Sequence, residues 1–238
     1  MALPKLNETL NFELKIPSTG QKVKYRPYLV KEEKVLLQAF ESGDPKTCLE
    51  AMTDTLAACI DERHEVDVSK LATFDVEYMF VKVRSKSVGE GSDLQIKCAS
   101  CKHENPVSVD LDEIEIEIGE EDNVIQIADG ISVEMRYPTY ETLSQQDMEK
   151  LEKEDLNAAM NMIATSISAI LTEEERINTS SLSIEEVVDF ISSMTTSQLK
   201  SLADYMENMP ALTHDVEFVC EHCNHENKMQ LKGLADFF

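Results

Sequence analysis

The chain has 238 residues, a hydrophobic content of 42% and a formal net charge of −24 at pH 7. This length allows one or two domains with a sizeable core, and the apolar content is typical of a folded globular chain. The strong acidity disfavours a nucleic-acid-binding role, because contacts to phosphate need clustered Lys and Arg, and no apolar run is long enough to cross a bilayer.

Cysteine usage indicates the redox compartment. The first residues lack the apolar stretch of a secretory signal, so we expect the protein to be made and kept in a reducing cytoplasm. Six cysteines in that compartment indicate bound metal and free thiols rather than disulfides. Two of them, Cys48 and Cys59, fall in predicted helices, and we expect them to be small buried apolar residues.

The first predicted element is a basic β-hairpin. Residues 10–17 alternate apolar and polar side chains, which predicts a strand, and residues 18–21 supply a turn. Residues 22–29 predict the returning strand, with Pro27 favouring a place at the sheet edge. Residues 1–36 hold seven basic and four acidic residues, a net charge of +3. Lysines on an edge strand discourage mispairing, and a bound acidic partner is the alternative explanation.

Three helices are predicted next: residues 31–42, residues 45–60, and a third that begins at Ser69 or Thr73 and ends near Val88. Asp44 can cap the second of them. The first should bury one apolar face, made of Val35, Leu36, Ala39 and Phe40. This front third of the chain contains no evident catalytic set.

Two short stretches then nearly repeat each other. Residues 98–105 and residues 220–227 both have the pattern C-x-x-C-x-H-E-N, and each lies between two alternating runs. A zinc ribbon is built from two such units, each of which consists of a strand, a knuckle and a second strand. A two-residue gap lets two thiolates reach one ion from a tight turn, and two knuckles supply a closed tetrahedral shell. We expect one structural zinc ion with four ligands, Cys98, Cys101, Cys220 and Cys223.

Two other interpretations of these cysteines stay open at this point. One is a set of four reduced thiols that hold no metal. The other is a redox pair, although a redox C-x-x-C is expected once, at a helix start beside a βαβ pattern. His103, His222 and His225 are candidate substitute ligands, and their positions favour polar groups that line the knuckles.

The segment between the knuckles begins with strand signals. Ile and Glu alternate over residues 114–118, which predicts a strand with one solvated face. Residues 124–128 and 131–137 alternate as well, and they flank Asp129 and Gly130. Asp-Gly between two such runs predicts a hairpin with a type I′ turn.

Residues 139–209 are predicted to be helical. The expected elements are a charged helix or loop over residues 140–153 and helices over residues 156–171, 184–192 and 197–209. Ser183 and Glu186 form a capping box for the third of these. Glu173, Glu174 and Glu175 are expected to form a solvated loop and not a metal site. At the end of the chain, Phe237 and Phe238 are expected to fold back on the core.

The middle of the chain is strongly acidic. Residues 111–190 hold four basic and twenty-one acidic residues, a net charge of −17. A solvated surface explains this composition, and a surface that steers a basic partner is the alternative.

The expected fold class is therefore α+β. An N-terminal β-hairpin with helices precedes a split four-cysteine zinc ribbon, which a β-hairpin and a helical bundle interrupt. The expected domains are an N-terminal region over residues 1–92, ribbon halves over residues 93–111 and 213–233, and an inserted region over residues 112–212. One zinc ion would tie the two ends of the insertion together.

Several segments resemble a known family. They are Leu3-Pro4-Lys5-Leu6-Asn7, Ile16-Pro17-Ser18-Thr19-Gly20, the run from Lys24-Tyr25-Arg26-Pro27-Tyr28 to Lys34, and the run from Phe74-Asp75-Val76-Glu77-Tyr78 to Arg84-Ser85-Lys86-Ser87-Val88-Gly89-Glu90. Together they resemble the baseplate hub protein family of T-even-type (Straboviridae-like) tailed bacteriophages. The resemblance covers most of the chain and is strongest before residue 110.

The resemblance implies a non-enzymatic structural or assembly protein of the hub at the tip of a contractile tail. Its implied partners are other baseplate hub or tail proteins, without nucleic acid or membrane. The implied location is the host cytoplasm during assembly, with the virion tail as a further possibility. The family supplies no catalytic residues to carry over, and the sequence gives no oligomeric state.

Two other functions fit the sequence less well. A zinc-ribbon regulator that binds nucleic acid is disfavoured by the net charge and by the lack of interleaved basic and aromatic residues in the knuckles. A metallohydrolase needs an open coordination position and a general base. The sequence contains no H-E-x-x-H helix, and no Gly-rich phosphate loop stands out.

Overall fold

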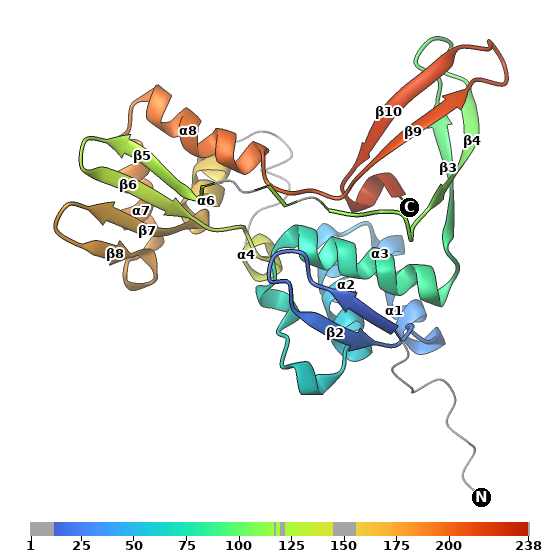
Figure 1. Ribbon diagram of the computed structural model, residues 1–238, viewed down its shortest axis with the longest axis horizontal. Coiled ribbons are helices and arrows are strands. Elements are labelled where there is room, and N and C mark those ends of the chain that lie inside the picture. Colours follow the sequence, from blue (N-terminus) through green and yellow to red (C-terminus); the bar gives the residue numbers. More distant parts are fainter. Residues whose placement is uncertain (1–11, 117, 120–121, 145–155, 238) are drawn as a thin grey trace, which may run out of the picture. The chain divides into compact units, whose positions relative to one another are not determined.

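The computed structural model of the protein describes residues 12–116, 118–119, 122–144 and 156–237. The chain forms two compact units, one made of Met1–Ile118 with Pro210–Phe238 and one made of Gly119–Met209 (Figure 1). The first unit thus combines both ends of the chain, and the second is a continuous insertion. The finer division that separates residues 1–92 from the knuckles stays a prediction. None of the described helices is both long and apolar enough to cross a membrane.

The first unit begins with the predicted hairpin and three helices. Their bounds are β1 Phe12–Lys15, β2 Lys22–Tyr25, α1 Val30–Ser42, α2 Pro45–Cys59 and α3 Thr73–Ser87. Helix α3 is the central element, because the successive residues Met79, Phe80 and Val81, which point to different sides of it, are all buried. Its buried Asp75 accepts a hydrogen bond from the backbone N–H of Ser18 at 2.8 Å, which anchors the turn of the hairpin to the helix.

The helix starts agree with the sequence only in part. Asp44 caps α2 as expected, and its carboxylate accepts from the N–H of Thr47 at 3.0 Å. The expected cap of α3 is wrong, because the N-cap is Ala72, which has no capping side chain. Thr73 is already the first helical residue, and Ser69 belongs to a short 3-10 helix, Val68–Lys70, that Asp67 caps.

The expected buried face of α1 is half wrong. Leu36 and Ala39 are buried, whereas Val35 and Phe40 are 49% and 46% exposed. The buried apolar face of α1 is narrower than expected because a polar residue occupies part of the inner side of the helix. Glu32 on the inner side accepts from the guanidinium of Arg26 at 3.0 Å, and both side chains are buried.

The two knuckle hairpins complete the first unit. Their strands are β3 Gly91–Lys97, β4 Glu104–Asp110, β9 Thr213–Val219 and β10 Glu226–Lys232. β3 pairs with β4 and β9 pairs with β10, both antiparallel, so that two two-stranded sheets form (Figure 1). The core that they share with α3 contains Val81, Ile96, Val109, Leu111, Ile114, Leu212, Val216, Leu231 and Phe237.

The end of the chain packs into this core. Phe237 is fully buried within the short 3-10 helix Leu234–Phe237, and its carbonyl accepts a hydrogen bond from the Ser92 hydroxyl at 2.7 Å. The prediction for Phe237 is therefore confirmed, and Phe238 lies outside the described residues.

The strand expected over residues 114–118 is wrong. The described part of this segment has no regular secondary structure and pairs with no described strand. Ile114 is nevertheless fully buried, and Ile116 packs against the same core. The apolar residues at every second position are therefore explained by the burial of an irregular connection. An alternation of apolar and polar residues does not by itself distinguish such a connection from a strand.

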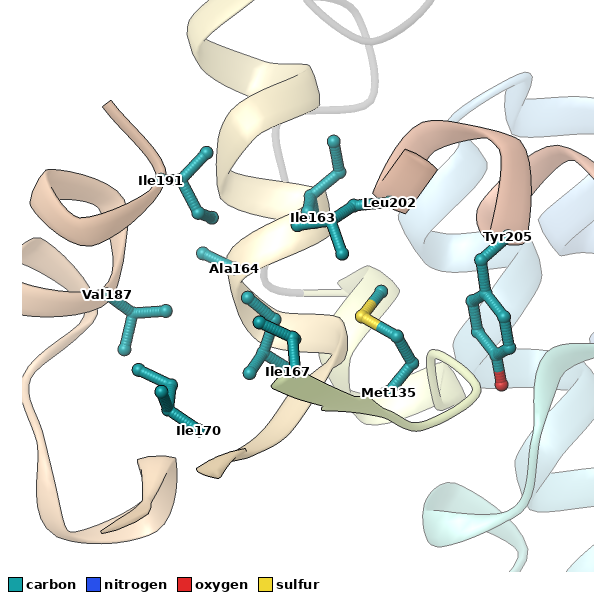
Figure 2. Close-up of a cluster of buried hydrophobic side chains, with 10 residues drawn as sticks. Met135, Ile163, Ala164, Ile167, Ile170, Val187, Ile191, Leu202 and Tyr205 are labelled. Atoms are coloured by element: carbon teal, nitrogen blue, oxygen red, sulfur yellow. The ribbon is translucent and has the colours of Figure 1, made fainter. Parts of the chain in front are cut away.

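The inserted unit contains a four-stranded antiparallel sheet in the order β5-β6-β7-β8. The strands are β5 Val124–Ala128, β6 Ile131–Met135, β7 Ile167–Thr172 and β8 Arg176–Asn178. Its helices are α4 Tyr140–Ser144, α6 Leu156–Ser166, α7 Ile184–Ser192 and α8 Thr196–Glu207, with a short 3-10 helix at Thr179–Ser181. Side chains from β6, β7, α6, α7 and α8 meet in one core (Figure 2). Residues 145–155, part of a predicted helix or loop, lie outside the described residues.

The helix expected over residues 156–171 is wrong in its last third. It ends at Ser166, and the chain continues as β7, which pairs with β6 on one side and β8 on the other. Ile163, Ile167 and Ile170 are all buried, so their spacing fits a helix although the chain changes conformation between them. The later segment Glu173–Glu175 is exposed, as expected for a solvated loop.

The capping box and the hairpin of the insertion were predicted more successfully. Ser183 and Glu186 exchange the expected bonds at the start of α7, at 2.8 and 3.2 Å. The β5–β6 hairpin is present, but its turn is not type I′, because only Gly130 of the two turn residues has a positive φ, of 71°. A register shift between Gln126 and Ala128 accompanies the turn.

Replacing Gly130 by Ala should lower the free energy of unfolding of the inserted unit by about 1–2 kcal/mol, because a Cβ disfavours the left-handed conformation. An added Cβ would also lie 2.9 Å from the Glu173 side chain. Urea denaturation would measure the loss. Gly130→Asn is the matched control and should lose less, since Asn tolerates a positive φ. Equal stability of Gly130→Ala and the unmodified protein would contradict the expectation.

Candidate metal centre

The two knuckle turns have the same backbone geometry. In the first, the N–H of Cys98 donates to the carbonyl of His103 at 2.8 Å, and the N–H of Lys102 donates to the carbonyl of Cys98 at 3.0 Å. The second turn repeats both bonds at 2.9 Å, from Cys220 to His225 and from Asn224 to Cys220. Each turn has one non-glycine residue in the left-handed region, Lys102 at φ 62° and Asn224 at φ 54°.

The four predicted ligand cysteines converge. Their sulfur atoms all lie within 4.8 Å of one another. The Sγ atoms of Cys98 and Cys223 are 3.7 Å apart, and those of Cys101 and Cys220 are 3.6 Å apart. A tetrahedral ion with Zn–S bonds of about 2.3 Å needs S···S separations of about 3.8 Å. The cysteines are free thiols and not disulfides, and their geometry fits one four-coordinate ion.

Each knuckle contributes one buried and one exposed cysteine. Cys98 and Cys220 are completely buried, whereas Cys101 and Cys223 are exposed. The buried cysteine of each knuckle directly follows a strand, β3 or β9, and the exposed one lies in the turn. An ion at this site would therefore link the end of each strand to its turn and stabilise both turns.

The backbone around the cysteines favours some thiolates and opposes others. The N–H of Cys101 lowers the pKa of the Cys98 thiol to about 6. Burial alone would raise the pKa of Cys220, but knuckle N–H groups lower it below the usual range. The N–H of His225 favours the Cys223 thiolate, yet hydrogen bonds with the neighbouring sulfurs raise the pKa of that thiol to about 12. A divalent cation resolves this conflict, because it favours all four thiolates.

Two buried asparagines join the knuckles to each other. The side-chain oxygen of Asn105 accepts from the N–H of Glu221 at 2.9 Å, and that of Asn227 accepts from the N–H of Ala99 at 2.9 Å. Both bonds cross from one hairpin to the N–H that follows the first cysteine of the other. Asn105 and Asn227 are only 1% and 6% exposed, so the accepting side chains are buried and the two bonds are partly buried.

The same asparagines also hold their own turns. The amide of Asn105 donates to the carbonyl of His103 at 2.8 Å, and the amide of Asn227 donates to the carbonyl of His225 at 2.9 Å. Sequence analysis missed this role. The available signal was the last letter of the repeated C-x-x-C-x-H-E-N pattern, because a side chain that repeats with the ligands is a candidate for supporting them.

The histidines are not part of the sulfur cluster. Among the described residues, the one group of metal-binding side chains that converges contains cysteines alone. His103 and His222 instead stack on each other, with ring centroids 5.3 Å apart. This contact joins the two hairpin tips on the outer side of the cluster.

A protein-family model described as T4 bacteriophage base plate protein matches residues 8–238. The chain belongs to this family. The match covers both knuckles and the insertion, so the T-even-type resemblance of the sequence is confirmed at the level of a baseplate protein. No curated protein and no solved structure matches the chain.

Native mass spectrometry of this baseplate protein, purified without added metal, should find one zinc ion per chain. Cys101→Ser should lose most of the zinc, because three thiolates leave the tetrahedral shell open. Cys48→Ser is the matched control and should keep the zinc, since Cys48 lies on α2, outside the sulfur cluster. Equal zinc content in the two variants would show that the cluster is not the binding site.

Asn105→Ala and Asn227→Ala should each lower the free energy of unfolding of the baseplate protein by about 1–3 kcal/mol, because each removes one bond between the hairpins and one bond within its own turn. Urea denaturation would report the loss, and a zinc chelator should remove metal faster from both variants. Gln230→Ala removes an exposed bond to Asp215 at 3.0 Å and serves as the control. Asparagine variants as stable as this control would exclude the crossed bonds as a stabilising feature.

Proposed function

We propose that the chain is a non-enzymatic structural or assembly protein of the baseplate hub of a contractile phage tail. It acts through protein–protein contacts, on a scaffold that one structural zinc ion holds together. Family membership supports a baseplate role. The observation that carries the rest is the convergence of four cysteine sulfurs from two distant knuckles.

A closed four-thiolate shell supports a structural role for the metal. Catalytic zinc keeps one coordination position for water or substrate, whereas four cysteines fill all positions. Among the described residues, no second group of three or more His, Cys, Asp or Glu side chains converges. The chemistry of the donor set therefore favours a metal that holds the fold together.

The β1–β2 hairpin offers a basic surface for one partner. Lys15, Lys22 and Lys24 are all exposed, and they share the outer face with a single acidic residue, Glu13. Arg26, which also contributes to the basic composition, is buried and bonded to the Ala58 carbonyl at 2.9 Å, so it is not part of this surface. We infer that the three lysines dock an acidic hub component.

The inserted unit offers the opposite charge. Residues 119–209 hold five basic and nineteen acidic residues, a net charge of −14, and Glu185, Glu186 and Asp189 on α7 are exposed. Charged surfaces of opposite sign steer and orient partners as they associate. We infer that this acidic region docks a different, basic component of the hub, so that the protein connects two neighbours during assembly in the host cytoplasm.

The triple variant Lys15→Glu, Lys22→Glu and Lys24→Glu should no longer co-purify with its hub partner from infected cells, because it reverses the sign of the hairpin face. The matched control is Lys34→Glu, Lys46→Glu and Lys70→Glu, which makes the same charge change at exposed lysines of other elements. Co-purification of the hairpin variant at the level of the control would refute a docking role for this face.

A further inference from the structure

The hydrogen bonds of the first knuckle hairpin show which main-chain groups face outward. The N–H of Cys98 donates to the carbonyl of His103, and the N–H of Leu111 donates to the carbonyl of Glu90. Residues of an antiparallel strand point their backbone groups alternately toward and away from the partner strand. The even-numbered residues of β3 therefore face β4, and the N–H and C=O groups of Asp93, Gln95 and Lys97 point outward.

The same alternation shows that the outer edges of β4 and β10 are each interrupted at one outward position. On β4 the outward positions include Pro106, which has no N–H, between Glu104 and Ser108. On β10 the N–H of Lys232 is already bonded to the Asp236 carboxylate at 2.7 Å.

Charge disfavours self-pairing at the outer edge of β9. Asp215 and Glu217 occupy adjacent outward positions of this strand. An antiparallel pairing of the edge with a copy of itself that is centred on either residue, or between them, sets acidic side chains opposite each other, which destabilises the pair. The edge of β3 has neither a proline nor a cap, and its charges are arranged differently.

The charges on the β3 edge are complementary to those of a second, antiparallel copy of the same edge. Asp93 lies two residues before Gln95 and Lys97 lies two residues after it. In an antiparallel pair centred on Gln95, each Asp93 therefore stands opposite Lys97 of the second copy. The link between Lys97 and Glu104 within the chain is 3.8 Å long and exposed. Such exposed pairs contribute little, so Lys97 is available to a partner.

A cleft with both polar and apolar walls lies beside the same edge. It has a volume of about 560 Å³ and is lined by residues 93–97 of β3, Glu104 of β4, Met229 and Leu231 of β10, and Ala235 and Asp236. Met229 is 41% exposed although it lies on the inner face of its strand. A strand added to β3 would cover part of this surface, so that backbone bonding and apolar burial favour the same occupant.

We propose that two copies of the chain associate through the outer edges of β3, antiparallel, about a two-fold axis at Gln95. The pairs are Gln95 with Gln95 and, twice, Asp93 with Lys97. Each exchanges two backbone hydrogen bonds, about six in all. The result is a continuous four-stranded sheet in the order β4-β3-β3-β4. This association concerns the chain alone and does not depend on the proposed hub function.

Sedimentation equilibrium of the full chain tests the proposal. The unmodified protein should shift with concentration from its monomer mass of 26.9 kDa to twice that value. Asp93→Lys and Lys97→Asp should each raise the dissociation constant at least about tenfold, because like charges then face each other in both outer pairs. An equimolar mixture of the two variants should restore association, since every outer pair of a mixed dimer joins Lys to Asp.

Asp215→Lys is the matched control, because it changes net charge as Asp93→Lys does but lies on the edge of β9, and it should leave the dissociation constant unchanged. Zinc content of each variant checks that the knuckles are intact. A protein that stays monomeric at all concentrations would overturn the proposal. So would a dimer that neither β3 variant weakens, or a mixture of the variants that fails to associate.

Discussion

The first unit depends on the meeting of two knuckles that are far apart in the sequence. Cys98 and Cys223 are separated by 125 positions, yet their sulfurs are 3.7 Å apart. Loop-closure entropy opposes such a contact, and the crossed bonds of Asn105 and Asn227 offset only part of that cost. A metal bound by the four thiolates would supply far more, because its binding free energy would become folding free energy. The shared core of the hairpins and α3 then includes both ends of the chain.

This arrangement explains why a large insertion is compatible with the pairing of the two knuckles. The inserted unit has a core of its own, formed by one sheet and three helices (Figure 2). Its two connections to the first unit, near residues 118 and 210, follow β4 and precede β9. A metal bound by the knuckles would therefore stabilise a different part of the chain from the insertion core, and one polypeptide carries both a basic hairpin and an acidic insertion.

The sequence predicted local features better than the pairing of distant segments. C-x-x-C spacing, the Asp44 cap and the capping box at Ser183 involve neighbouring residues, so their patterns determine the geometry directly. Residues 167–172 form a strand because β6 and β8 pair with them. The helical spacing of the isoleucines in this segment does not indicate that pairing. The exposed side of Phe40 and the crossed bonds of Asn105 likewise depend on contacts made by distant residues. Tertiary context decided each of these cases.

X-ray absorption spectroscopy at the zinc edge tests the central claim most directly, because it reports the atoms bound to the metal. We expect a single shell of four sulfur atoms at about 2.3 Å, with no nitrogen or oxygen neighbour. A shell that includes nitrogen or oxygen, or a purified protein with four free thiols and no metal, would contradict the account of a closed metal centre that holds the two knuckles together.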